Sequence, residues 1–208
     1  RLANGDILHV YTRYYGNSSD DHATARLCSR RSTDGGETWT RKDLVELENE
    51  GRLNVMSVSL LRLANGEIMM TYLVKESVVD CIPYVRFSSD EGETWSERVR
   101  CIDGVSYNVV NNDRVIQLKN GAILIPVAEH PLKNPGKSND VDWNAIVYCR
   151  YSTDDGRTWK STGAVENPGV VFQEPGLVEL ADGSVLMNIR TNGGAQYYSR
   201  STDGGMTW

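Results

Sequence analysis

The stretch Ser32-Thr33-Asp34-Gly35-Gly36-Glu37-Thr38-Trp39 decides the architecture, because the pattern Ser-x-Asp-x-Gly-x-Thr-Trp occurs four times in this chain of 208 residues. The other copies run from Ser88 to Trp95, from Ser152 to Trp159 and from Ser201 to Trp208. They start roughly 50 to 65 residues apart, a period at which each unit is one supersecondary block that buries its apolar face only against its neighbours. The sequence therefore predicts a row of similar blocks.

Each copy of the pattern, called a box below, is predicted to be a hairpin turn. Short alternating apolar runs precede the four boxes, at residues 25–29, 82–87, 145–151 and 196–199, as expected of strands. The Asp side chain can accept hydrogen bonds from backbone N–H groups two residues on, the Gly permits a positive φ, and the Trp would cover the apolar seam. Metal ligation or an aromatic sugar platform is the alternative for these residues, but four copies around a ring cannot all face one site.

A second turn signal precedes every box. It is Asn4-Gly5, Asn65-Gly66, Asn120-Gly121 and Asp182-Gly183, each flanked by apolar runs, and such pairs are the strongest short-range hairpin cue. Each block therefore contains four strands. In the second block they are predicted at about residues 56–63, 67–74, 81–88 and 96–102.

Four-stranded blocks without any sustained helical period predict an all-β fold, a β-propeller. The blades are expected at approximately 1–50, 51–104, 105–165 and 166–208, within a single domain, 1–208. The first block shows no innermost strand before Leu2, and the fourth ends at Trp208 before an outermost strand. We therefore expect a partial propeller from a longer chain, with open sheet edges that favour a homo-oligomer.

The amino-acid composition limits the kinds of molecule that this protein is expected to bind. The net charge is −6, 39% of the residues are hydrophobic and 24% are charged, which argues against a nucleic-acid-binding protein, since such proteins are usually basic. No apolar run is long enough to span a bilayer. The four cysteines lack zinc-type spacing, and the sequence points to no metal and no cofactor.

The cysteines are predicted to be structural. Cys28, Cys81 and Cys149 fall in the third strands of their blocks, where a small buried thiol is ordinary. If the turn after Asp90 sets the register, Cys81 and Cys101 lie nearly opposite each other. They could then form a disulfide in an oxidising compartment.

Functional residues are expected on the rim away from the boxes. The box rim holds only tight turns, whereas the opposite rim receives the longer and chemically varied segments, where binding and catalysis concentrate. These segments are residues 14–23, 46–55, 106–113, 130–144 and 166–174. Hairpin register around Asp182-Gly183 places Glu174 beside Arg190 at that rim, either as a plain salt bridge or as a site pair. Register around Asn120-Gly121 places Asn112, Asp113 and Arg114 near residues 126–129.

The four boxes, together with the segment from Gln173 to Arg190, resemble the sialidase (neuraminidase) superfamily of six-bladed Asp-box, or BNR-repeat, propellers. The boxes alone are only moderately specific, because non-enzymatic receptor propellers also carry them, and the Glu174 to Arg190 segment is the sharper match. The resemblance extends over the whole chain as about four of six blades. It implies that Glu174 polarises a tyrosine nucleophile and that Arg190 is one of three arginines that grip the substrate carboxylate.

The loop before the first box also resembles the sialidase pattern. Sialidases carry an acid/base Asp there, which implies Asp21, or its neighbour Asp20, in that role; a solvated acidic loop is the alternative. Arg13, at the end of the preceding strand, could contact an acidic sugar or be an ordinary surface residue. The tripeptide Asn112-Asp113-Arg114 is outside the usual sialidase motif and suggests a modified substrate contact.

The resemblance implies an exo-α-sialidase-like glycoside hydrolase that releases terminal sialic acid with retention. The first Arg of the triad is expected before Leu2, and the third Arg and the Tyr nucleophile are expected beyond Trp208, so this segment alone is expected to be inactive. A non-catalytic propeller that binds glycan or protein, and a hydrolase for another acidic sugar such as a uronate, are the alternatives. The substrate is expected to be a sialoglycan or another acidic glycan, and the resemblance favours a secreted or periplasmic location.

Overall fold

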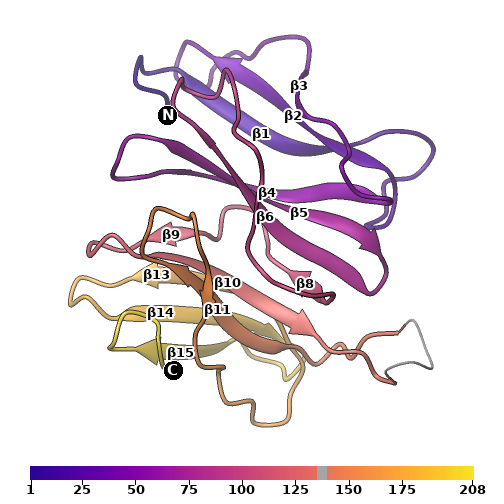
Figure 1. Cartoon of the computed structure of the whole chain (residues 1–208), viewed down its shortest axis with the longest axis vertical. Coiled ribbons are helices and arrows are strands. Elements are labelled where there is room, and N and C mark those ends of the chain that lie inside the picture. Colours follow the sequence, from indigo (N-terminus) through magenta and orange to yellow (C-terminus); the bar gives the residue numbers. More distant parts are fainter. Residues whose placement is uncertain (135–139) are drawn as a thin grey trace.

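The chain forms only strands, turns and loops in the described residues, 1–134 and 140–208, of a computed structural model (Figure 1). None of the described segments is a helix that could cross a membrane. The strands are β1 (Ile7–Tyr14), β2 (Ala25–Ser32), β3 (Leu44–Leu47), β4 (Asn54–Arg62), β5 (Ile68–Ser77), β6 (Asp80–Ser88), β7 (Val99–Arg100), β8 (Tyr107–Val109), β9 (Ile116–Gln117), β10 (Ile123–His130), β11 (Ile146–Ser152), β12 (Lys160–Ser161), β13 (Phe172–Glu179), β14 (Val185–Thr191) and β15 (Tyr197–Ser201). The predicted all-β class is confirmed.

The strands pair antiparallel within four consecutive groups, β1 to β3, β4 to β7, β8 to β12 and β13 to β15, and in the third group both β8 and β9 pair with β10. One parallel bridge, between Cys81 and Tyr107, links the second group to the third. In Figure 1 the groups follow one another from top to bottom in chain order, the tight turns lie toward the left and longer loops lie toward the right. This is the open arrangement of a partial propeller. The blade limits given above stay a prediction.

Alternation along the central strands explains why the groups stack. Successive side chains of β5 point to opposite faces of its sheet: Met69 and Leu73 pack in one apolar cluster, whereas Met70 and Tyr72 pack in another. Because both faces are covered by neighbouring sheets, β5 is buried from Ile68 onward over eight residues. Strand β10 divides its side chains in the same way between the first of these clusters and a third one. Three apolar seams therefore hold four groups of strands together.

The boxes are turns closed by their own polar side chains. In the second box, Asp90 accepts hydrogen bonds from the Thr94 N–H, at 2.9 Å, and from the Thr94 hydroxyl, at 2.5 Å, while the Ser88 hydroxyl accepts one from the Gly92 N–H, at 2.8 Å. The Thr94 hydroxyl, followed by the other donors, lowers the pKa of Asp90 to about 2. The turn was predicted, but the main donor lies four residues after the Asp rather than two, because the box is a longer loop than an Asx turn.

The second, third and fourth boxes also dock on the preceding group of strands. A Cβ atom on Gly92 would lie 2.9 Å from Leu8, and one on Gly156 would lie 3.0 Å from Met69 and 3.1 Å from Phe87. Both glycines have positive φ, of 81° and 83°. The box glycine is therefore required both by backbone conformation and by the close contact between sheets.

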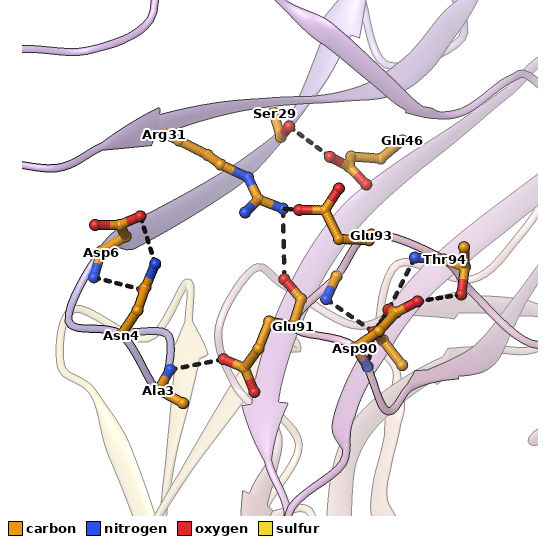
Figure 2. Close-up of polar contacts among 12 residues, drawn as sticks. Ala3, Asn4, Asp6, Ser29, Arg31, Glu46, Asp90, Glu91, Glu93 and Thr94 are labelled. Carbon is orange, nitrogen blue, oxygen red and sulfur yellow. Dashed lines mark hydrogen bonds and ion pairs between the residues drawn. The ribbon is translucent and has the colours of Figure 1, made fainter.

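Polar contacts reinforce the first seam at the box rim (Figure 2). Arg31, on β2, forms an ion pair of 2.7 Å with Glu93 and donates a 3.4 Å hydrogen bond to the backbone oxygen of Glu91. The Ala3 N–H donates to the Glu91 carboxylate at 2.7 Å. The indole of Trp95 donates to Glu46 at 3.0 Å. The second box thus lies against residues from the first group of strands through both apolar and polar contacts.

The cysteines are buried and free, and no disulfide joins Cys81 to Cys101. The register predicted from the box turn was wrong by two residues. Tyr84 pairs with Arg100, and the Cys101 N–H donates to the Pro83 oxygen at 3.0 Å. Cys101 therefore lies opposite Pro83, two positions along the strand from Cys81. Burial raises the pKa of the Cys81 thiol to about 12.

Candidate functional site

A cavity of about 420 Å³ lies at the ends of the strands away from the boxes, where the loops of all four groups meet. It is lined by residues from segments far apart in the sequence, including four of the predicted site residues: Asp21, Glu174 and Arg190, and also Asn112. The other lining residues are His22, Met56, Ser57, Leu73, Lys75, Cys81, Tyr107, Asn108, Val109, Asn111, Asn112, His130, Trp143 and Gln173. The longer loops were expected to converge on this rim, and these side chains do meet there.

A β-bulge in β13 gives Glu174 its position. The pairing of β13 with β14 shifts between Gln173 and Gly176, and Glu174 itself has a φ of 48°, a left-handed conformation that non-glycine residues seldom adopt. The bulge brings the Glu174 carboxylate to 2.6 Å from the Arg190 guanidinium. The predicted juxtaposition of Glu174 and Arg190 is therefore found. Their side chains are 33% and 59% exposed, so substrate could reach both.

A comparable bulge lies in the inner strand of the second group, and a positive φ also occurs where the inner strand of the third group is interrupted. Strand β4 has a register shift between Met56 and Ser59, with Ser57 at a φ of 57°. Asp113, which follows β8, has a φ of 55°. Strained backbone of this kind concentrates at functional sites because the surrounding structure must hold it in place. Here it aims one side chain per inner strand, and Ser57 and Glu174 both line the cavity.

Two buried side chains hold the loop that carries Asp21 in place through hydrogen bonds to its backbone oxygens. The Asn54 amide donates to the backbone oxygens of Asp21 and Ala23, at 3.0 and 2.8 Å, and the Lys75 ammonium donates to the Asp21 oxygen at 2.8 Å. These bonds hold the backbone at Asp21, and Asp21 lines the cavity. Neither Asn54 nor Lys75 was identified from the sequence, because nothing in β4 or β5 indicates which polar residue reaches a distant loop.

The Asp20 carboxylate forms its hydrogen bonds within its own loop. Its carboxylate accepts hydrogen bonds from the Ser18 hydroxyl, at 2.7 Å, and from the His22 N–H, at 2.8 Å. The Ser18 hydroxyl, and then the His22 N–H, lower the pKa of Asp20. Asp20 does not line the cavity. Of the two candidate acids, Asp21 is the one that the structure brings to the other site residues.

The segment Asn112 to Arg114 does not lie where hairpin register predicted. Glu129 pairs with Asn108, and the pairing with β10 resumes only at Ile116. The intervening residues leave the sheet, because the inner strand is interrupted between β8 and β9. Asn112 lines this cavity and also a separate cavity of about 460 Å³ between β1 and β4, whereas Asp113 lines only the latter of the two.

Two arginines proposed as substrate contacts lie elsewhere. Arg114 extends toward the last group of strands, where a Cβ atom on Gly176 would lie 2.6 Å from its guanidinium. Arg13 forms an ion pair with Asp43, and both residues line a third cavity. Neither Arg13 nor Arg114 lines the cavity that holds Glu174. A role for either arginine in substrate binding stays a prediction.

His130 and Trp143 complete one wall of the cavity and were not singled out from the sequence. His130 is 2% exposed, its Nδ1 lies 2.9 Å from the Asp142 oxygen, and burial lowers its pKa. The neutral ring therefore donates from Nδ1 to that carbonyl. Trp143 is 49% exposed and stands edge-on to His130, with ring centres 5.4 Å apart. An exposed aromatic ring of this kind can pack against the apolar face of a sugar.

The cavity combines a carboxylate–guanidinium pair, a second carboxylate and a buried ammonium group. A guanidinium can bind a carboxylate through two parallel charge-assisted bonds, and a carboxylate can transfer protons to and from a ligand. Among the described residues, no group of three or more His, Cys, Asp and Glu side chains could hold a metal ion.

Comparisons with known proteins agree with this architecture. The model of the BNR repeat-like domain family matches residues 9–208. The chain is 26% identical over 243 aligned residues to a sialidase of Paraclostridium sordellii, covering 100% of this chain and 55% of the relative. It is 31% identical over 177 residues to an anhydrosialidase of Macrobdella decora, covering 78% of this chain and 21% of the relative.

Among solved structures, a protein of unknown function from Dyadobacter fermentans superposes with a TM-score of 0.80 at 23% identity, covering 100% of this chain and 65% of that one. This likeness concerns the fold. The chain spans slightly more than half the length of the two clostridial sialidases that it matches, 55% and 58%. The solved sialidase structures that the chain superposes on show the same sialidase-type fold. Because the family model matches nearly the whole chain, the protein belongs to the BNR repeat-like domain family.

Proposed function

We propose that this chain is part of a sialidase-like glycoside hydrolase that releases a terminal, α-linked sialic acid from a glycan with retention of configuration. The observation that carries the proposal is the 2.6 Å contact between Glu174 and Arg190 on a cavity shared with Asp21. Membership in the BNR repeat-like family and similarity to sialidases over the whole chain support the same substrate class. The complete protein's activity is part of this proposal.

Each of the three residues has a role that follows from its chemistry. Arg190 binds the sugar carboxylate, because its planar fork suits two parallel hydrogen bonds to a carboxylate. Glu174 draws the proton from a neutral phenol, which is otherwise a poor nucleophile near pH 7. Asp21 protonates the departing glycosidic oxygen and later activates water. Of these groups, the Glu174–Arg190 pair is preorganised by the bulge in β13.

The test is hydrolysis of a fluorogenic sialoside by the complete protein and its variants. We expect Glu174→Gln to lower kcat by about 100-fold or more, as for loss of a group that moves a proton. We expect Arg190→Ala to lower kcat/KM by about 10- to 100-fold, as for loss of a charge-assisted bond. Near-wild-type turnover in either variant would contradict these assignments.

The matched control is Arg200→Ala. Arg200 lies on the neighbouring strand, β15, and pairs with Asp182 at the opposite end of the same sheet, with the two side chains 49% and 56% exposed. It therefore matches Arg190 in residue type, exposure and pairing but not in position. We expect its activity to stay within about twofold of wild type, since an exposed ion pair contributes about 0–1 kcal/mol to stability.

The same assay separates the alternatives. A non-catalytic glycan-binding propeller would bind sialosides without hydrolysing them, and a uronidase would hydrolyse uronosides instead. The prediction that open sheet edges associate into a homo-oligomer is separate from this test, and light scattering of the complete protein addresses it.

A further inference from the structure

Lys75 is a buried cation on the wall of the cavity. It lies near the end of β5, its exposed fraction is 2%, and it lines the cavity together with Asp21 and Tyr107. Its Nζ donates one hydrogen bond, of 2.8 Å, to the backbone oxygen of Asp21, and lies 5.4 Å from the centre of the Tyr107 ring. Within the described part of the chain, the lysine that forms an ion pair is Lys133, not Lys75.

These contacts leave the charge of Lys75 poorly balanced. An ammonium group has three N–H donors, and one bond to a neutral carbonyl and a distant ring face do not replace its hydration. Burying a charge without an opposite charge is costly, so buried lysines are normally paired or perform a function. Arg190, the other cation that lines this cavity, already has Glu174 as its partner. Among residues 1–134 and 140–208, Lys75 is thus the cation of the cavity wall that forms no ion pair with a carboxylate.

Holding the Asp21 loop does not account for this lysine. The Asn54 amide already donates to the same Asp21 oxygen, at 3.0 Å, and to the Ala23 oxygen, at 2.8 Å. A neutral donor therefore already performs the loop-holding task next to Lys75, and a neutral backbone carbonyl supplies no counter-charge for the ammonium group. The charge itself needs another partner, and the open side of Lys75 is the cavity.

We propose that Lys75 binds a carboxylate of the ligand that fills this cavity, as a second cationic contact beside Arg190. The inference deepens the proposed function and rests on the cavity being the sugar site. It makes the site selective for acidic over neutral sugars, because a neutral ligand leaves the buried ammonium without a counter-charge. The wall that Lys75 shares with His130 and Trp143 would then hold the sugar ring.

The test compares Lys75→Met with wild type in the complete protein. Methionine keeps the length and apolar stem of lysine without its charge. Binding of four probes is measured by calorimetry: N-acetylneuraminate, glucuronate and the methyl ester of each. We expect Lys75→Met to weaken binding of at least one acid by roughly 10- to 100-fold, the loss typical of a hydrogen bond to a charged group, and to weaken its ester by less than about threefold. Lys119→Met is the control, since Lys119 is exposed in the turn before Gly121.

Thermal unfolding separates a binding role from a structural one. Replacing a buried, poorly paired charge with an apolar side chain is often neutral or stabilising, so Lys75→Met should unfold at the same or a higher temperature. Asn54→Ala, which removes the other support of the loop, should unfold at a lower temperature. Equal losses for acid and ester, a clearly lower unfolding temperature in Lys75→Met, or no acid binding by the wild type would each overturn the inference.

The outcome is distinguishable from that of the proposed hydrolase. If sialosides are not cleaved but glucuronate binding depends on Lys75, the carboxylate contact stands and the sialidase assignment fails. If sialosides are cleaved with Glu174 and Arg190 in their roles, while Lys75→Met binds both acids like wild type, the hydrolase stands and the Lys75 inference fails.

Discussion

The box rim and the cavity rim of the molecule differ in which features recur from one group of strands to the next. At the box rim, both the residue types and the backbone geometry repeat. In the second and third boxes the Asp carboxylate accepts a hydrogen bond from the Thr four residues later, and the box glycine lies close against the preceding sheet. At the cavity rim only the geometry repeats. Ser57 and Glu174 occupy comparable bulges with positive φ, but one is a small hydroxyl and the other a carboxylate paired with Arg190.

The difference separates residues that build the fold from residues that serve a site. A box must contact its neighbour in the same way at every seam, so its residue types are fixed by local physics. A bulge only aims a side chain, and the choice of side chain is free for each strand. Bulges that recur with different side chains therefore mark the candidate site more clearly than the repeated boxes do.

The largest effect on stability is expected from the box tryptophans. Trp95 packs against the first seam and donates to Glu46, whereas Trp39 is 37% exposed and donates to the Gly36 oxygen of its own turn. Trp95→Ala should lower the free energy of unfolding by about 3 kcal/mol, in the range for truncation of a packed aromatic side chain, and Trp39→Ala by clearly less. Denaturant titration measures both. Equal losses would show that the boxes do not act through the seams.

The next largest effect is expected at a box glycine. Gly156→Ala combines strained φ with contacts of 3.0 and 3.1 Å to Met69 and Phe87, whereas Gly121→Ala, in a tight turn with a φ of 91°, meets nothing within 4 Å. Backbone strain alone costs about 1–2 kcal/mol, and overpacking adds about 1–3 kcal/mol. Gly156→Ala should thus be the more destabilising of the two in the same titration. The reverse order would contradict close docking of the boxes.

A bulge at the cavity rim should tolerate, and gain from, a glycine. Ser57→Gly removes the left-handed strain at a φ of 57° and should raise the free energy of unfolding by up to about 1 kcal/mol. Turnover should fall less than in Glu174→Gln at the comparable bulge, because loss of the Ser57 hydroxyl removes no charge from the cavity. A large loss of activity in Ser57→Gly would show that the Ser57 side chain takes part in the site.

The smallest effect is expected at an exposed box carboxylate. The pKa of Asp90 is lowered to about 2 in the folded protein, so its bonds stabilise the fold above about pH 4, its ordinary unfolded value, and are lost as the pH falls toward 2. Thr94→Val removes the hydroxyl donor and should raise the pKa of Asp90, so that acid unfolding begins at a higher pH. Carboxyl NMR titration measures the shift. An unchanged pKa would show that the backbone N–H groups and the Ser88 hydroxyl hold the carboxylate without the Thr94 hydroxyl.

Sequence reasoning succeeded where contacts are local. The turn at Asp182-Gly183 fixes the pairing of β13 with β14, and this register brings Glu174 to Arg190 despite a bulge that the sequence did not predict. It failed where a strand is interrupted: the gap between β8 and β9 moves Asn112 to Arg114 away from β10. It also placed Cys101 two residues from its actual position opposite Pro83, because a box adds residues to the turn.

The sequence by itself determined the all-β class, the repeated hairpins and the side-by-side position of one acidic and one basic residue, since all of these follow from short-range turn chemistry and strand alternation. Only the tertiary structure decided which residues share the cavity. Lys75, Asn54, His130 and Trp143 come to Asp21 and Glu174 from separate groups of strands, and their meeting depends on how whole sheets pack across apolar seams. No local pattern in the chain encodes such a long-range arrangement.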